Sequence, residues 1–139
     1  MSQINAYLTF AGNCRDAMNF YKSCLGGELY MQTVGETAMA GRMPPETHAL
    51  VMHSSLSNGS LVLMASDMMA DGEGVVQGNA TTLMLQCGSE TEIKECFSKL
   101  SAGGKVNAAV KEKFWGSLFG DLTDKFGHRW MLNYDKPKA

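Results

Sequence analysis

The chain has 139 residues, of which 45% are hydrophobic and 19% charged, and this composition is typical of one globular domain or of two small halves sharing a core. Twelve Lys and Arg against fourteen Asp and Glu give a formal charge of −2, which argues against non-specific nucleic-acid binding, because that activity needs a surplus of basic groups. No apolar run approaches the roughly 18 residues of a membrane span, and the N-terminus lacks a signal-peptide pattern. We therefore expect a cytoplasmic protein that binds neither nucleic acid nor membrane.

The first half of the chain predicts a strand at residues 4–10, then a helix, then three further strands. Apolar residues recur at helical spacing between Cys14 and Leu25. Asn13 is the expected N-cap, and Gly26 with Gly27 ends the helix. The later strands are predicted at residues 27–34, 48–56 and 60–67, with a loop at residues 35–46 that contains two prolines.

The second half repeats this order. Strands are predicted at residues 80–87, 104–112, 116–123 and 128–135, and residues 89–92 fit a capping box at the start of the intervening helix. Gly103 and Gly104 follow Gly26 and Gly27 by 77 residues, and residues 127–135 resemble residues 59–67 at an offset of 68. The chain is thus predicted to hold two copies, residues 1–67 and 80–135, joined by a linker at residues 68–79.

A module of this size cannot bury its sheet face alone. The sequence therefore predicts a single α+β domain over residues 1–139. In it, two βαβββ modules form a curled eight-stranded mixed sheet with helices on its convex back. The concave front would be a cup, and a cup is where a small ligand binds.

Strand alternation assigns side chains to this cup. Ala6 and Leu8 face the helix in the first strand, as Trp130 and Leu132 do in the last, and the third and seventh strands alternate too poorly to assign. The repeat aligns Leu63 with Met131, so the strand at residues 60–67 contributes Leu61, Leu63 and Ala65. The expected cup residues are Asn5, Tyr7, Thr9, Leu61, Leu63, Ala65, Thr82, Met84, Gln86, Arg129, Met131 and Asn133.

Two groups give this predicted cup a binding chemistry. Arg129 could hold a carboxylate or phosphate, because its guanidinium donates two parallel hydrogen bonds. Trp115, next to Phe114, either stacks on a planar ligand at the rim or packs in an interface or the core.

The histidines and cysteines predict no further site. His48 and His53 are expected on one strand, facing opposite sides, and His128 is expected to face away from Met131, so we predict surface or hydrogen-bonded histidines rather than metal ligands. The four cysteines form no Cys-x-x-Cys pair and are expected to be reduced, mostly buried thiols. The alternative is a disulfide from Cys14 or Cys24 to Cys96.

Four stretches carry a resemblance to a known family. Residues 7–21, 63–67, 114–120 and 124–133 are similar to the opening, middle and closing segments of PhnB-like proteins in the vicinal oxygen chelate superfamily. That superfamily includes glyoxalase I, bleomycin-resistance proteins, fosfomycin-resistance enzymes and extradiol dioxygenases. The resemblance implies the paired βαβββ fold and a homodimer whose interface completes or covers the cups.

The resemblance also implies where a metal would bind. Its catalytic branches hold a divalent metal through His, Gln or Glu at four positions, which fall here on Tyr7, Leu63, Thr82 and Met131. None of these four is a usual ligand for Zn, Mg, Mn or Ni.

We therefore predict a metal-independent, PhnB-like protein that binds a small organic molecule, with no cofactor and with itself as partner. One alternative is a metal-dependent lyase, transferase or dioxygenase whose ligands lie off the expected register or on the partner chain. Another is a drug-sequestering protein like the bleomycin-binding relatives. Whether any reaction is catalysed stays open.

Overall fold

The computed structural model describes residues 2–67 and 74–137 and divides the chain into two compact units. The N-terminal unit spans Met1–Val76 and the C-terminal unit spans Gln77–Ala139. The boundary falls within residues 68–79, the predicted linker, of which residues 68–73 lie outside the described residues. Each unit is described below by itself.

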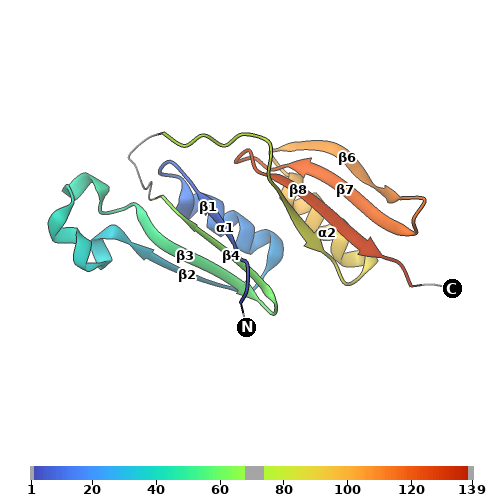
Figure 1. Ribbon diagram of the computed structural model, residues 1–139, viewed down its shortest axis with the longest axis horizontal. Coiled ribbons are helices and arrows are strands. Elements are labelled where there is room, and N and C mark those ends of the chain that lie inside the picture. The colour runs from blue at the N-terminus through green and yellow to red at the C-terminus, as the bar shows by residue number, and fades with distance from the viewer. Residues whose placement is uncertain (1, 68–73, 138–139) are drawn as a thin grey trace. The chain divides into compact units, whose positions relative to one another are not determined.

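The N-terminal unit is one helix on a four-stranded mixed sheet (Figure 1). Its elements are β1 (Ala6–Thr9), α1 (Cys14–Leu25), β2 (Glu28–Thr33), β3 (Val51–Asn58) and β4 (Leu61–Ser66). The strand order is β1-β4-β3-β2, in which β1 and β4 run parallel and the other pairs antiparallel.

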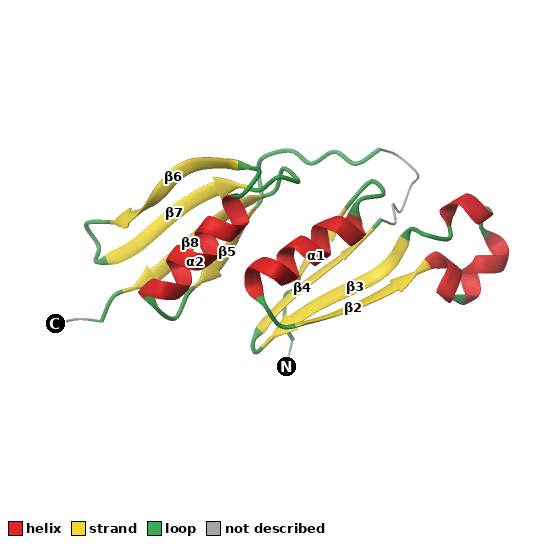
Figure 2. Ribbon diagram, turned by 180° about the vertical axis from the view of Figure 1, so that it is seen from behind, coloured by secondary structure: helices red, strands yellow, loops and turns green. Residues whose placement is uncertain are grey.

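The C-terminal unit repeats this topology. Its elements are β5 (Thr82–Gln86), α2 (Glu90–Ser101), β6 (Lys105–Glu112), β7 (Ser117–Thr123) and β8 (Arg129–Asp135). The strand order β5-β8-β7-β6 again pairs the first and last strands in parallel. Figure 2 shows α1 and α2 each lying across one face of its own sheet.

The predicted α+β fold of two βαβββ modules is confirmed. The predicted single eight-stranded sheet is wrong in its hydrogen-bonded strand pairing. Eight strands were predicted and eight form, yet they pair as two sheets of four. The reason is that β4 and β8 each return along the first strand of their own module, so each ladder is complete within one unit. The curl and the shared cup stay predictions.

Residues 35–46 differ from the predicted loop. Three short 3₁₀ helices form there, at Val34–Glu36, Ala38–Arg42 and Pro45–Thr47. His48 follows the last of them in a helical turn, so β3 begins at Val51 instead of residue 48. The prediction that His48 and His53 share a strand is therefore wrong, because the turn that starts at Pro45 continues through His48.

The apolar stripe of each helix forms the core of its unit. Cys14, Ala17, Met18, Tyr21 and Cys24 are buried on α1, which packs against β2, β3 and β4. On α2 the buried residues are Ile93, Phe97 and Leu100. Each large apolar side chain buried in this way stabilises the fold by about 1.5–3 kcal/mol.

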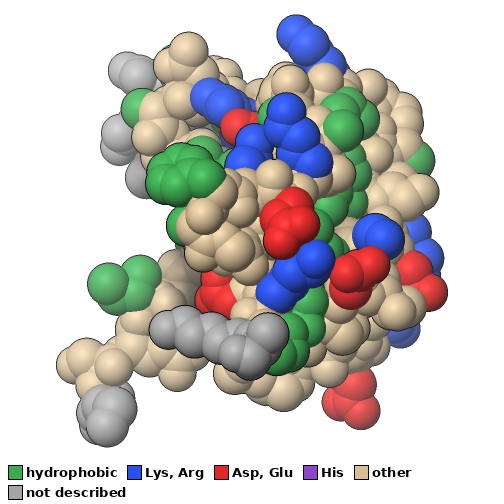
Figure 3. Space-filling view, turned by 90° about the vertical axis from the view of Figure 1, so that its right-hand side faces the viewer, with side chains coloured by type: hydrophobic (Ala, Val, Ile, Leu, Met, Phe, Trp, Pro, Cys, Tyr) green, Lys and Arg blue, Asp and Glu red, His purple; other side chains and the backbone are tan. Residues whose placement is uncertain are grey.

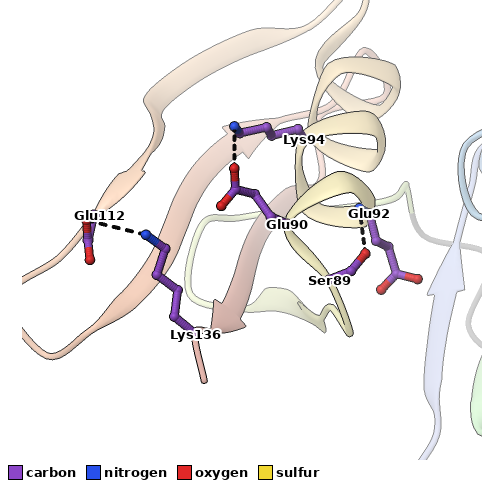
Figure 4. A network of polar contacts seen from close by, with 6 residues as sticks. All are labelled: Ser89, Glu90, Glu92, Lys94, Glu112 and Lys136. Atoms are coloured by element: carbon purple, nitrogen blue, oxygen red, sulfur yellow. Dashed lines mark hydrogen bonds and ion pairs between the residues drawn. The ribbon is translucent and has the colours of Figure 1, made fainter. Parts of the chain in front are cut away.

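The two helix N-termini are capped differently, and Figure 4 shows the cap of α2. On α2 the Ser89 hydroxyl accepts a hydrogen bond from the amide of Glu92, as predicted, while the Glu92 carboxylate accepts from the amide of Gly88. On α1 Asn13 is the N-cap residue, as predicted, but its side chain makes no capping hydrogen bond. Asp67, just after β4, instead accepts from the amide of Cys14. A carboxylate from a distant strand replaces a local cap.

Figure 4 also shows two surface ion pairs, Lys94 with Glu90 and Lys136 with Glu112. In the view of Figure 3 acidic and basic side chains are interspersed rather than gathered by sign. Exposed pairs of this kind contribute little to stability, because water and salt screen their attraction. Among the described residues, no helix has the length and apolar character needed to cross a membrane.

Candidate functional site

Each sheet has one face under its helix and an opposite face that carries the candidate site residues. Side chains of directly paired residues share a face, so the pairing places Tyr7, Met64, Ser55 and Tyr30 in one row across the N-terminal sheet. The buried Leu63 and Leu56 lie on the other side, under α1. We call the first side the open face of the N-terminal sheet.

A tyrosine and a histidine meet on this open face. The Tyr7 hydroxyl lies 3.3 Å from Nδ1 of His53, and the two ring centroids are 5.9 Å apart with planes tilted by 30°. Tyr7 is 49% exposed and Tyr30, in the same row, is 58% exposed. The face therefore presents aromatic surface around one titratable nitrogen heterocycle.

The open face of the C-terminal sheet holds the second group of predicted residues. Met84 pairs directly with Met131, Thr82 with Arg129, and Gln86 with Asn133. Their neighbours Leu83, Leu85, Trp130 and Leu132 point to the α2 side, as alternation predicted. The two methionines place thioethers side by side, and Met84 is 57% exposed.

Arg129 on this face already has an anionic partner. Its Nη2 lies 3.1 Å from Oδ2 of Asp121 on β7, with side-chain exposures of 37% and 15%. Asp121 also accepts a hydrogen bond from the Asn107 amide at 3.2 Å. An incoming carboxylate or phosphate would therefore have to compete with Asp121 for the guanidinium.

Asn133 is the centre of a polar network. It is 7% exposed, and its amide donates to Oε1 of Gln86 and to Oδ1 of Asp135. Ser117 also donates to Asp135, and this hydrogen bond is the main cause that lowers the pKa of that carboxyl. The Asn133 side chain, predicted to bind ligand, therefore donates its amide hydrogens to groups within the protein.

Trp115 lies in the turn between β6 and β7 and is 54% exposed. Its ring packs edge-on against Phe114 at 4.9 Å and against Phe119 at 6.3 Å between centroids. Phe114 is 96% exposed. Since Phe119 pairs with Asn133 in the ladder, the aromatic turn is continuous with the open face of the C-terminal sheet.

The assignment of Leu63 to the ligand-binding face is wrong. Leu63 is 4% exposed, and with Leu61 and Ala65 it belongs to the side of the sheet that α1 covers. Met64 takes its place on the open face, directly opposite Tyr7.

The two closing hairpins explain this error. A side chain at Gly27 would overlap the carbonyl oxygen of Ser57, and one at Gly104 would overlap that of Thr123, so Ser57 and Thr123 are equivalent. Residues 58–61 join Ser57 to its partner Val62, whereas residues 124–128 join Thr123 to Arg129. The second connection is one residue longer, and a one-residue slip moves every side chain to the other face.

Three predicted residues lie near the ends of their strands. Asn5 precedes β1, is exposed, and accepts a hydrogen bond from Gln3. Thr9 ends β1 opposite Ser66, and Thr82 begins β5 opposite Arg129. By ladder position the counterpart of Tyr7 in the second unit is Met84, two residues beyond Thr82.

The three histidines have different surroundings. Nε2 of His48 lies 2.8 Å from the carbonyl oxygen of Ala40 and 3.2 Å from that of Met43, so this ring ties the 3₁₀ segment to the start of β3. Burial lowers the pKa of His128. His53 alone lies on an open face with the predicted binding residues.

Sequence reasoning missed His53 because the residues of β3 do not alternate clearly between polar and apolar. Ser54 is fully buried and donates to the carbonyl oxygen of Ala65, so a polar residue stands where an apolar one would mark the core side. The pairing of β1 with β4 and of β4 with β3 is what brings His53 to Tyr7.

The cysteines, all within the described residues, are thiols and not disulfides. Burial raises the pKa of Cys14 to about 11 and that of Cys87 to about 12. Thiols held neutral in this way are poor nucleophiles at physiological pH.

The residues at the implied metal positions do not fit a hard divalent cation. Placed on the open faces by the observed pairing, these positions hold Tyr7, Met64, Met84 and Met131. A phenol and three thioethers are not the nitrogen and oxygen ligands that such cations prefer. Within residues 2–67 and 74–137, no cluster of three or more His, Cys, Asp or Glu side chains is arranged to hold a metal ion.

Comparison with known proteins gives consistent matches over nearly the whole chain. Residues 3–132 match the model of the Glyoxalase/Bleomycin resistance protein/Dioxygenase superfamily. Protein YjdN of Escherichia coli (strain K12) is 35% identical over 96% of this chain and 95% of its own length.

Solved structures agree with this match. Protein PA1353 from Pseudomonas aeruginosa is 34% identical, covers 99% of this chain and 100% of its own, and superimposes with a TM-score of 0.86. A PhnB protein from Bacillus cereus, described as a putative 3-demethylubiquinone-9 3-methyltransferase, is 26% identical over 96% of this chain and 99% of its own, with a TM-score of 0.75.

Proposed function

This chain belongs to the Glyoxalase/Bleomycin resistance protein/Dioxygenase superfamily, and we propose that it binds a small organic molecule on the open faces of its sheets without a divalent metal. One observation carries the proposal. The positions that the family resemblance implies for a metal, placed by the observed strand pairing, are Tyr7, Met64, Met84 and Met131, which suit an organic ligand better than a hard cation.

The side chains of both faces support this choice. Methionine is flexible and polarizable, so Met64, Met84 and Met131 can adapt to an irregular apolar surface. Polar groups lie beside them in fixed orientations, because Tyr7 hydrogen-bonds His53 and Gln86 hydrogen-bonds Asn133. Apolar surface with a few oriented polar groups is the usual composition of small-molecule sites.

The ion pair on the C-terminal sheet refines the expected ligand. Because Asp121 already neutralises Arg129 at 3.1 Å, a simple anion gains less there than an isolated arginine would offer. We therefore favour a neutral ligand, or one whose charge is only part of its recognition.

The first experiment tests the absence of metal. Purified protein is incubated with Ni²⁺, Zn²⁺ or Mn²⁺, dialysed, and analysed by elemental mass spectrometry. We expect less than one tenth of an equivalent retained, since the four positions offer no hard ligands. A full equivalent that is lost on mutation of open-face residues would overturn the proposal and favour the metal-dependent enzyme.

The second experiment tests ligand binding. A library of small aromatic and aliphatic oxygen compounds is titrated into ¹⁵N-labelled protein, and amide shifts are mapped on the two sheets. We expect hits to perturb β1, β4, β5 and β8 residues whose side chains lie on the open faces. Met84→Ala should weaken hits on the C-terminal sheet two- to tenfold, whereas Lys99→Ala on the exposed side of α2 should not. Hits that map only to the helices would contradict the proposal.

A further inference from the structure

We propose that His53, positioned by Tyr7, recognises the carbonyl oxygen of a neutral aromatic compound on the open face of the N-terminal sheet. This inference rests on the proposed function and names a ligand class for one of its two faces. All the residues that carry it belong to the N-terminal unit, so it needs no group from elsewhere.

The contacts of His53 leave one ring nitrogen for a ligand. Nδ1 lies 3.3 Å from the Tyr7 hydroxyl, and the ring is half-buried. Over the part of the chain that the structure describes, Nε2 of His53 makes no hydrogen bond to the protein. A histidine held through one nitrogen, with the other open, is oriented for a contact outside the fold.

The direction of the Tyr7–His53 hydrogen bond decides which nitrogen of the neutral ring carries the proton, and the proposal takes the phenol as the donor. A neutral imidazole has one donor and one acceptor nitrogen. When the phenol donates to Nδ1, Nε2 must carry the hydrogen. When the ring is protonated, both nitrogens donate and the phenol oxygen accepts from Nδ1. In both of these states Nε2 is a donor whose natural partner is an acceptor oxygen, whereas the other neutral tautomer, in which Nδ1–H donates to the phenol oxygen, would make Nε2 an acceptor.

The side chains around His53 indicate which kind of ligand would fit beside it. Met64 lies between Tyr7 and Ser55 in the ladder, and Tyr30 follows Ser55, so a thioether and two aromatic rings flank the histidine. The four strands contain no Lys or Arg, and their one acidic residue is Glu28 at the start of β2. A strongly anionic ligand finds no permanent counter-charge there, whereas a planar carbonyl compound finds a donor and apolar contact.

The first test needs no ligand. Long-range ¹H–¹⁵N correlations of the histidine rings are recorded near pH 8.5, where the imidazole side chain is ordinarily neutral. We expect the His53 signals of a protonated Nε2 and of an unprotonated, hydrogen-bonded Nδ1. Tyr7→Phe should shift the Nδ1 signal, and Tyr30→Phe on the same face should leave it unchanged. A protonated Nδ1, or a signal that ignores Tyr7→Phe, overturns the positioning role.

The second test uses acetophenone, with toluene as the probe that lacks the oxygen and benzoate as the anionic probe. We expect acetophenone to perturb β1, β3 and β4 amides and to bind at least threefold more tightly than either comparison compound. His53→Leu should weaken acetophenone three- to tenfold, the worth of one hydrogen bond. His53→Gln, which keeps an amide donor, should retain most of the affinity.

The outcomes separate this inference from the proposed function. Acetophenone that binds no better than toluene overturns carbonyl recognition, even if the library screen finds other ligands on the open faces. Benzoate as the tightest probe overturns the neutral ligand class. If the protein binds no library compound but keeps the Tyr7–His53 signal, the proposed function and the ligand class are both overturned. The assignment of the His53 hydrogen to Nε2 would still stand.

Discussion

Tyr7 on β1 reaches across β4 to place its hydroxyl 3.3 Å from Nδ1 of His53 on β3. The two residues are 46 positions apart in the chain and two strands apart in the sheet. Their contact lies on the open face, where Met64 separates them along β4. Here a residue selected from the sequence and a residue overlooked there form a chemical unit.

Asp67 is predicted to be essential for the stability of the N-terminal unit. Its carboxylate accepts hydrogen bonds from the amides of Gly12, Cys14 and Val51 at 2.9–3.0 Å. Asp67→Ala would leave these donors unpaired, two of them in buried bonds, and should lower the free energy of unfolding by about 3 kcal/mol or more. Urea denaturation measures this. Asp16→Ala in the exposed first turn of α1 is the control and should cost at most about 1 kcal/mol; equal losses would contradict the role of Asp67.

Gly120 is predicted to tolerate no side chain. A Cβ there would lie 2.7 Å from the Phe97 ring and 2.8 Å from Cγ2 of Val110. Gly120→Ala should therefore destabilise the protein by about 1–3 kcal/mol through overpacking. Gly41→Ala, where a Cβ meets nothing within 4 Å, is the matched control and should be neutral or slightly stabilising. Thermal melts of both variants decide, and similar melting temperatures would show that the α2–β7 contact adapts.

The buried thiols are predicted to make stability fall at high pH. Burial raises the pKa of Cys14 to about 11 and that of Cys87 to about 12, from the ordinary thiol value of 9.0. Above the unfolded value the unfolded chain binds fewer protons than the folded one, so this contribution is complete below about pH 9 and is lost as the pH rises toward 11–12. Urea midpoints from pH 8 to 11 should fall more steeply for the natural chain than for a Cys14→Ala, Cys87→Ala variant. Parallel slopes would exclude the thiols as the cause.

Removal of Asp121 is predicted to create an anion site. In Asp121→Asn the carboxylate 3.1 Å from Arg129 is gone, so the guanidinium can bind an added anion. Phenylphosphonate should bind this variant about two- to fivefold more tightly than the natural chain, the worth of an exposed ion pair. Adding Arg129→Ala should abolish the gain, as followed by amide shifts on β8. Unchanged affinity in Asp121→Asn would mean that Arg129 is not the limiting group.

The aromatic turn is predicted to contribute to a homodimer. The family resemblance implies such an assembly, and Phe114 is 96% exposed beside Trp115. Light scattering should give about 30 kDa for the natural chain, twice the mass of 15.1 kDa. Phe114→Ser should shift the mass toward the monomer, while Val76→Ser, at an equally exposed apolar residue, should not. A dimer that survives Phe114→Ser would leave Trp115 to its other predicted role, stacking on a ligand.

The strands and helices were predictable because local patterns determine them. The stripe from Cys14 to Cys24 and the glycines after each helix gave α1 and its end to within a residue, and all eight strands form near their predicted places. The face assignment of the C-terminal sheet also followed, since Leu83 and Leu85 alternate cleanly with Thr82, Met84 and Gln86.

Local patterns failed where a distant group replaced a local one. Asn13 is the N-cap residue of α1, but the side-chain acceptor for the Cys14 amide is Asp67, just after β4. Leu63 looked like a counterpart of Met131, but one extra residue between Thr123 and Arg129 shifts the alignment of the two modules.

Hydrophobic periodicity and helix-ending glycines act over a few residues and were enough to predict the two βαβββ modules, while four local stretches carried the family resemblance. The folded chain was needed to show that Met64 faces Tyr7, that Asp121 pairs with Arg129, and that His53 meets the Tyr7 hydroxyl. These relationships depend on which strands pair and in what register, and register is set by the combined burial and turn lengths of segments far apart in the chain.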